Sequence, residues 1–333
     1  MPKIRGRVGE INNKTMASIA STKGKGWMRD YPDFRDNTTN TKTVSDRQAK
    51  RGAVKPVQLV LDDLHKVRTK KLAKAKSKAA AKSPVKVDLR EWCSPIEDQG
   101  EIGSCTAHAG TALYEYFERR AYGKHIEASR LFLYKVTRNL LNWTGDDGAY
   151  LRTTMGALAM FGLVPEKYWP YVEDKFNDEP AAFHYSFAKN YKALLYYRLD
   201  VPGLHHDKLL EKIKEHLSMG LPLIFGFTCF TSLDQDSVEQ TGGIPFPDEK
   251  EETDGGHAVM AVGFDDSVEV VNASNRRKTK GAIMIRNSWS KKWGMQGYGW
   301  LPYEYVLQGL ATDWWTMTKG EWIETGKFGL DKP

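Results

Sequence analysis

The sequence predicts an α+β fold with two packed lobes, because helical patterns gather in the first half of the folded part and strand-like runs in the second. A further observation concerns the N-terminal quarter, which is basic and lacks a sustained apolar period. The chain has 333 residues with a hydrophobic fraction of 41%, enough for a substantial core. We therefore expect a leader at 1–86 and a folded unit at 87–333.

Four helices are expected from apolar spacing and from start and stop signals. In the first, Leu113, Phe117 and Ala121 share one face. The third stops at Gly162, with Pro165 just beyond. The predicted helices cover 106–121, 127–140, 150–161 and the segment LLEKIKEHLSMG that follows Asp207.

The strands are expected later in the chain, as short runs rich in apolar, β-branched and aromatic residues. Such runs lie at 221–228, 257–265, 281–288 and 297–302. The order of helices before strands favours two lobes over an alternating α/β arrangement.

The net charge of the chain changes sign at the boundary between the expected leader and the expected folded unit. Residues 1–86 contain 22 Lys and Arg and 7 Asp and Glu, a net charge of +15, whereas the remainder contains 27 and 35, a net charge of −8. The two parts should attract each other over a Debye length of about 8–10 Å in physiological salt. Within the leader we expect a short amphipathic helix at 57–68 and a Lys/Ala-rich linker at 69–84 that is open to proteolysis.

One apolar island interrupts the polar leader. The segment GWMRDYPDFRD bunches Trp27, Met28, Tyr31, Pro32 and Phe34. Large apolar residues in such a setting suggest a segment that docks onto a groove, and a chance cluster in a loose tail is the alternative.

Composition also limits the class of protein. There is no run of about 18 apolar residues, so no membrane span is expected, and the first residues lack the apolar stretch of a secretory signal. Cys93, Cys105 and Cys229 are too few for a disulfide framework. Cys93 and Cys229 could pair, but two buried thiols are expected, which suits the cytoplasm or another reducing compartment. No metal-ligand spacing or phosphate-binding loop is present, so neither metal nor cofactor is expected.

The segment DQGEIGSCTAHAG carries the chemistry. Cys105 stands where a Gly-rich loop should turn into a helix, and there unpaired backbone N–H groups and the helix dipole favour the thiolate. Gln99, six residues upstream, could place its amide N–H₂ near the same point. With the backbone N–H of Cys105 it would form two donors for a developing oxyanion.

Together with Val87-Asp88-Leu89-Arg90, this segment resembles the mature start and active-site loop of the papain family of cysteine peptidases. In that family a histidine follows within Gly-His-Ala, and an Asn-Ser-Trp follows later. This sequence supplies His257 in GGHAVMAVGFDD and Asn287 in IRNSWSKKWGMQGYGW, 152 and 30 residues further on in turn. GLVPEKYWPY also resembles a stretch between the family's cysteine and histidine. The resemblance covers about residues 87–317 and implies a helical lobe, an antiparallel β-barrel-like lobe and a cleft between them.

The resemblance implies a role for each matching residue. Cys105 would attack the scissile carbonyl, and His257 would take the thiol proton and later protonate the leaving amine. Asn287 would orient the imidazole, Trp289 would cover that hydrogen bond, and Gln99 would serve the oxyanion hole.

The chain departs from the family pattern in several places. Thr106 stands where a Trp usually follows the nucleophile, and Ile102 stands where many relatives have a disulfide-forming Cys. The family's pro-segment signature is not recognisable in residues 1–86. Inhibition by this leader must therefore be argued from physics.

Substrate-binding candidates also follow from the resemblance. Gly148, Ala149 and Tyr150 resemble the loop that pairs with the substrate backbone, and Ala258 should line the same specificity pocket. Asp313 is a candidate for the pocket floor, where an acid would favour Arg or Lys, with a structural carboxylate as the alternative. The full set of candidates is Gly148, Ala149, Tyr150, Ala258, Trp289 and Asp313.

The leading hypothesis is a monomeric cysteine endopeptidase that acts on proteins or peptides and is made as a zymogen inhibited by residues 1–86. A second hypothesis is a peptidase-fold scaffold whose Lys-rich segment binds nucleic acid or an anionic surface. The intact set of Cys105, His257, Asn287 and Gln99 argues against that, and we expect neither nucleic acid nor membrane as the main partner. A third is transpeptidation or deamidation through the same thioester.

Overall fold

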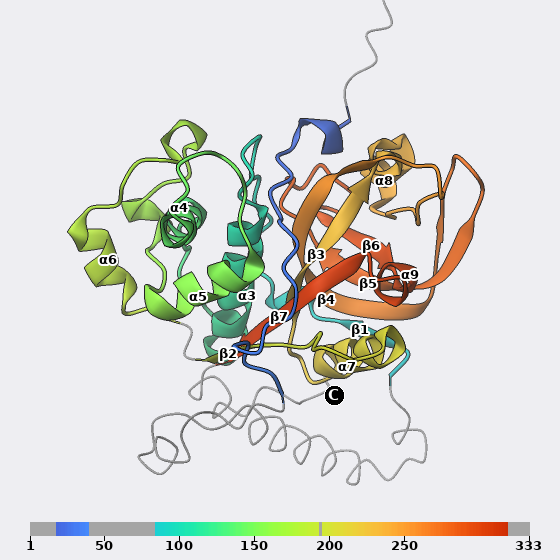
Figure 1. Ribbon diagram of the computed structural model, residues 1–333, viewed down its shortest axis with the longest axis horizontal. Helices are drawn as coiled ribbons and strands as arrows, with labels where there is room; N and C mark the ends of the chain where they lie inside the picture. Colours follow the sequence, from blue (N-terminus) through green and yellow to red (C-terminus); the bar gives the residue numbers. More distant parts are fainter. Residues whose placement is uncertain (1–17, 40–83, 193–194, 319–333) are drawn as a thin grey trace, which may run out of the picture.

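The computed structural model describes residues 18–39, 84–192 and 195–318, and it divides into a helical half and a sheet half (Figure 1). The helical half contains α3 (Cys105–Tyr122), α4 (Arg130–Leu141), α5 (Leu151–Met160) and α6 (Ala182–Ala188). The sheet half is built on one antiparallel sheet with the strand order β2-β7-β3-β4-β5-β6, and β1 adds to β4. The α+β class predicted from the sequence is confirmed.

The strands of this sheet are short, except for one. They are β1 (Lys86–Asp88), β2 (Leu195–Arg198), β3 (Leu223–Phe230), β4 (Thr253–Val271), β5 (Lys278–Arg286), β6 (Tyr298–Pro302) and β7 (Ala311–Thr318). The long β4 pairs with β3, β5 and β1, so it is the centre of the sheet. Its middle residues are buried, because both α3 and α7 (His206–Ser218) pack against β4.

The remaining elements are α7, which contacts β4 and β3, and several short helices and turns. The helices are α7 (His206–Ser218), α8 (Asp236–Thr241) and α9 (Tyr303–Leu307). The 3₁₀ turns are η1 (Ala20–Thr22), η3 (Arg90–Trp92), η4 (Glu166–Tyr168), η5 (Glu173–Lys175) and η6 (Thr231–Asp234).

Local chemistry fixes the helix ends that position the site. Helix α3 begins at Cys105, directly after a Gly-rich loop, and ends at Gly123, whose φ of 76° is the left-handed conformation that glycine adopts without strain. The side chain of Ser129 accepts a hydrogen bond from the Phe132 N–H and so caps α4. The first three predicted helices agree with α3, α4 and α5 within three residues at each end.

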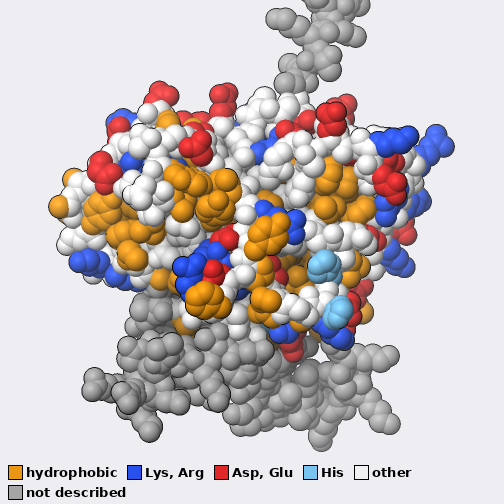
Figure 2. Space-filling view, in the orientation of Figure 1, with side chains coloured by type: hydrophobic (Ala, Val, Ile, Leu, Met, Phe, Trp, Pro, Cys, Tyr) orange, Lys and Arg blue, Asp and Glu red, His pale blue; other side chains and the backbone are white. Residues whose placement is uncertain are grey.

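Residues 18–39, which we call the cleft segment, run between the two halves instead of forming a separate unit (Figure 1). Isolated bridges join Trp27 to Ala149 and Thr38 to Arg198. Between the halves, in the middle of the view, basic and acidic side chains meet beside exposed hydrophobic ones (Figure 2). The predicted helix at 57–68 and the linker at 69–83 lie outside the described residues.

Two sequence-based expectations concern the cysteines and the membrane. Cys93, Cys105 and Cys229 are all free and buried, so no disulfide joins them. Within the part of the chain that the structure describes, no helix is both long and apolar enough to cross a bilayer.

Candidate active site

Cys105 is the first residue of α3 and is completely buried. Burial raises the pKa of its thiol to about 11, against the opposing effect of backbone N–H groups from Ala258, Gly26 and Thr106, which favour the thiolate. One of these three groups, Gly26, belongs to the cleft segment. In this state the thiol therefore holds its proton at neutral pH.

His257 lies on β4, one residue before Ala258, and Asn287 follows the end of β5. Because β4 and β5 are neighbours in the sheet, His257 Nε2 and Asn287 Oδ1 come within 2.8 Å of each other. The indole of Trp289 stacks on the imidazole at 4.4 Å between centroids. Burial lowers the pKa of His257 to about 4, although the bond to Asn287 opposes the shift.

The hydrogen bond to Asn287 also determines which nitrogen of the His257 imidazole carries the proton. An amide oxygen facing Nε2 requires the proton on Nε2, so Nδ1 keeps its lone pair. Nδ1 is buried and has no hydrogen-bond partner among the described residues. A neutral imidazole in this tautomer can accept a proton on that side.

Gln99 is buried and its amide is held at both ends. Its Oε1 accepts a bond from Ser288 Oγ at 2.6 Å, and its backbone N–H donates to the Ser288 carbonyl. The orientation of the amide is thereby fixed, with Nε2 directed to the Gly24 carbonyl oxygen at 2.8 Å and that of Ile102 at 3.1 Å. Gly24 belongs to the cleft segment, so a main-chain carbonyl already occupies this donor.

The cleft segment binds both halves through its backbone. Trp27 N–H donates to the Gly256 carbonyl at 3.0 Å, and Met28 N–H donates to that of Ala149 at 3.2 Å. Ala149 N–H in turn donates to the Gly26 carbonyl at 2.8 Å. The segment thus lies in the cleft as an extra strand beside Ala149.

The cleft segment passes Gly103 and Gly148 at Gly26, and there the backbones approach too closely for side chains. A Cβ added to Gly26 would lie 1.9 Å from the Gly103 carbonyl oxygen, and one added to Gly148 would lie 2.0 Å from the Gly26 carbonyl oxygen. Gly148 has a φ of 77°, so it also needs glycine for its conformation. The crossing therefore depends on glycine on both sides.

Trp27 enters a slot in the sheet half. Its indole Nε1–H donates to Asp313 Oδ2 at 3.1 Å, and the side chain is nearly buried. Cβ atoms built on Gly226 and Gly256 would lie 1.9 Å and 2.6 Å from ring atoms of the indole. These two glycines leave the room that the ring fills.

Charged groups hold the two ends of the cleft segment. Lys23 pairs with Asp98 and Lys25 with Asp254, at acids whose side chains are nearly half exposed. Further along, the guanidinium of Arg152 pairs with Asp30 and donates hydrogen bonds to both carboxylate oxygens of the buried Asp36. This second set of contacts is multidentate and mostly shielded from water.

The predicted substrate-binding residues fall into two groups. Gly148, Ala149 and Asp313 contact the cleft segment, and Ala258 directs its N–H to the thiol. Tyr150 is the residue before α5 and packs against Trp143, while Trp289 is fully buried over the imidazole. Sequence reasoning missed Arg198, Gly226 and Gly256, which carried no local signal.

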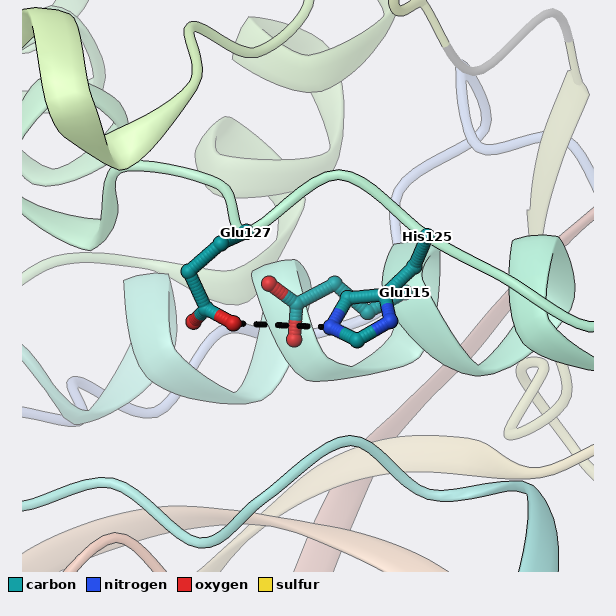
Figure 3. A group of neighbouring side chains, drawn as sticks. All are labelled: Glu115, His125 and Glu127. Atoms are coloured by element: carbon teal, nitrogen blue, oxygen red, sulfur yellow. Dashed lines mark ion pairs between the residues drawn. The ribbon is translucent and has the colours of Figure 1, made fainter.

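One further cluster has the composition of a metal site. Glu115, His125 and Glu127 bring possible ligand atoms within 4.8 Å of one another (Figure 3). Arg130 already binds both carboxylates, at 3.0 Å from Glu115 and 2.6 Å from Glu127, so its guanidinium supplies the positive charge there. The cluster joins α3 to the start of α4 and does not need a cation.

Comparison with known proteins gives consistent matches. The family described as papain family cysteine protease matches residues 83–312. An uncharacterized peptidase C1-like protein of Acanthamoeba polyphaga mimivirus is 36% identical over 233 residues, which are 69% of this chain and 71% of that protein. The thiol protease aleurain of Arabidopsis thaliana is 26% identical over 273 residues, 80% of this chain and 66% of the relative.

Solved structures agree with the sequence matches. Xylellain, a cysteine protease from Xylella fastidiosa, superposes with a TM-score of 0.65 at 29% identity, covering 90% of this chain and 97% of that one. The bromelain protease from Ananas comosus, solved with the E64 inhibitor, has a TM-score of 0.50 at 17% identity over 71% of this chain and 99% of its own, and supports the fold. The expected two-lobe architecture, a helical lobe and an antiparallel sheet lobe, is confirmed.

Proposed function

Because the chain belongs to the papain family of cysteine proteases, we propose that it is an endopeptidase whose nucleophile is Cys105 and whose base is His257. Asn287 orients the imidazole, and Gln99 stabilises the oxyanion. The cleft segment inhibits this site until it is released. Membership in the family makes the protein a hydrolase; the residue roles and the zymogen state are our proposal.

The proposed chemistry begins with proton transfer from the Cys105 thiol to His257 Nδ1. The thiolate attacks the scissile carbonyl carbon, and the oxygen takes the negative charge between Gln99 Nε2–H and the backbone N–H of Cys105. When the C–N bond breaks, Nδ1–H protonates the leaving amine and a thioester remains. Water, deprotonated by His257, then attacks the thioester, and the acid and the thiol are regenerated.

The bond between His257 Nε2 and Asn287 Oδ1 supports these roles. It keeps the proton on Nε2 and leaves Nδ1 to exchange a proton with the thiol. Trp289 covers this bond and keeps water from competing with it.

The observation that carries the zymogen proposal is the position of Gly24. Its carbonyl oxygen accepts the Gln99 amide bond that the oxyanion would need. Gly26 N–H lies at the sulfur, and Trp27 fills the slot beside it. A substrate cannot reach the nucleophile while the segment is bound.

Burial explains how release would switch on the chemistry. The covered site has a thiol with a raised pKa and an imidazole with a lowered pKa, which is a neutral pair. Removing the segment returns water to both groups and so favours the thiolate–imidazolium pair.

The test is to compare full-length protein with protein cleaved between residues 40 and 83 and freed of its N-terminal fragment. An epoxide that alkylates active-site thiols should modify Cys105 rapidly only in the cleaved form, which should hydrolyse fluorogenic dipeptide amides. Cys105→Ala should abolish both, and His257→Gln should lower kcat/KM by roughly 10³-fold or more. A full-length protein as active as the cleaved one would rule out the zymogen state, and failure to label Cys105 in either form would rule out the nucleophile.

A further inference from the structure

We propose that the slot filled by Trp27 selects substrates with an indole side chain, and that Asp313 reads the indole N–H while Arg198 prevents the slot from accepting a cation. This inference rests on the proposed peptidase function and replaces the Arg or Lys preference expected from an acid at the pocket floor.

The slot has the shape of a flat ring. Gly226 of β3 and Gly256 of β4 lie directly against the indole of Trp27. A Cβ on either residue would clash with the ring. Strand β7 pairs with β3 next to this point, with Gly226 opposite Thr312, and so brings Asp313 to the slot. A branched aliphatic side chain would leave part of such a narrow slot unfilled.

One carboxylate oxygen of Asp313 is open towards the cleft segment. Its Oδ1 already accepts a bond from Trp315 Nε1 at 2.6 Å and lies 3.2 Å from Arg198 Nη1. Only Oδ2 faces the cleft segment, where Trp27 Nε1–H binds it. One oxygen matches the single donor of an indole.

Arg198 compensates part of the charge of Asp313, and it shares its guanidinium with Asp200. Arg198 is almost fully buried, and Asp200 holds it through Nε at 3.0 Å and Nη2 at 2.9 Å. Burial raises the pKa of Asp313 to about 7, which Arg198 only partly opposes. A Lys or Arg side chain in the slot would meet a second, fixed positive charge, because Arg198 Nη1 lies 3.2 Å from Asp313 Oδ1.

Arg198 is a positioning residue in this account, because it acts through Asp313. It also contacts the cleft segment, through the Asp30 carbonyl oxygen at 2.9 Å from Nη2 and Asp36 at 3.7 Å from Nη1. Those contacts are lost with the segment, whereas Asp200 and Asp313 remain.

The test measures kcat/KM of the cleaved enzyme on fluorogenic dipeptide amides in which one position holds Trp, benzothienylalanine, Arg or Ala, with each position varied in turn. Benzothienylalanine keeps the two fused rings and lacks the N–H, so it isolates the bond to Asp313. We expect Trp to exceed benzothienylalanine by about tenfold or more at one of the two positions, and to exceed Arg there by at least as much. Equal rates for Trp and benzothienylalanine at both positions, with Ala and Trp substrates both cleaved, would overturn the inference but leave the peptidase intact; no cleavage of any substrate would overturn the proposed function itself.

Two variants separate specificity from folding. Arg198→Gln should shift the Trp-to-Arg ratio towards Arg by about tenfold or more, because it uncovers the charge of Asp313, whereas a merely structural role would lower all rates together. Gly226→Ala should reduce cleavage of the Trp substrate relative to the Ala substrate, because the methyl group fills the slot. If Arg198→Gln does not fold, the comparison of Trp with benzothienylalanine in the unmodified enzyme still decides.

Discussion

The two ends of the cleft segment bind in different ways. From Lys23 to Lys25 it is held by backbone bonds and by lysines paired with half-exposed acids, whereas from Asp30 to Asp36 it is held by carboxylates on Arg152. Trp27 stands between the two stretches and is nearly buried. Gly24 in the first stretch lies at Gln99, and Gly26, just after it, lies at Cys105. We expect the second stretch and Trp27 to supply most of the retention, so under the proposed zymogen state the contacts that inhibit would differ from the contacts that hold.

The largest expected effect concerns the covered thiol. Because burial raises the pKa of Cys105 to about 11, its epoxide labelling in full-length protein should rise about tenfold per pH unit from pH 7 to 10. In cleaved protein the thiolate forms at lower pH, so labelling should reach its plateau near neutrality, at a rate at least about 10³-fold higher at pH 7. Identical pH profiles in the two forms would mean that the segment does not control the thiol. Cys93 and Cys229, buried with raised pKa values, serve as internal controls that stay unlabelled.

The next effect should come from Trp27→Ala in the full-length chain. Loss of a buried Trp side chain should destabilise the covered state by about 3–5 kcal/mol. The opened state, in which the cleft segment has left the site, should then be populated on the order of 10²-fold more or higher. Labelling of Cys105 at pH 7 measures that population. Trp27→Phe is the matched control, since it keeps most of the apolar contact and loses only the bond to Asp313; it should raise labelling about tenfold. Labelling of Trp27→Phe equal to that of the unmodified chain would mean that this bond does not help to hold the segment. Equal labelling of the two variants would mean that the apolar contact of the ring does not.

Asp36→Asn should follow, with a rise in labelling of about tenfold, because the amide cannot replace the paired bonds to Arg152. Asp33→Asn is the control. Asp33 pairs mainly with Arg35 within the segment itself, at an exposed position, so this change should leave labelling unaltered. Similar effects of the two variants would mean that the segment is held by its own folded conformation and not by its contact with Arg152.

The smallest effect is expected for Lys23→Ala and Lys25→Ala. Their acid partners are nearly half exposed, and such pairs contribute about 0–1 kcal/mol, so labelling should rise less than about fivefold. The rise should vanish in about 0.5 M salt, where the Debye length is only a few ångströms. A salt-independent rise would indicate that the lysines act through packing.

The sequence predicted the parts that depend on local pattern. Helix α3 was placed within one residue, because a Gly-rich loop and Gly123 bound a clear apolar period. Cys105, His257, Asn287 and Gln99 could be named together only because motif spacing matched a known family. The sequence also singled out Trp27, because a large aromatic in a polar leader is unusual.

Other features could not be predicted, because they depend on contacts between distant residues. Strand β7 is buried along almost its whole length, so it has no alternating pattern, and β1 is only three residues long. Arg198 lies 115 positions before Asp313, and nothing in either neighbourhood announces their pairing. An acid at a pocket floor suggested a cation as its ligand, with a structural carboxylate as the alternative; the position of Arg198 beside Asp313, on which the indole proposal rests, carried no signal in the sequence.

The glycine crossing has a consequence for how latency could be adjusted. Gly26 passes over the cleft with no room for a methyl group between it and Gly103. The methyl group of an alanine there would clash with the Gly103 carbonyl oxygen and push the segment away from the thiol, with no residue after position 39 changed. If the cleft segment inhibits the enzyme as we propose, the size of the side chain at residue 26 would set how readily the site opens, which makes this residue the natural place for a designed or light-sensitive switch.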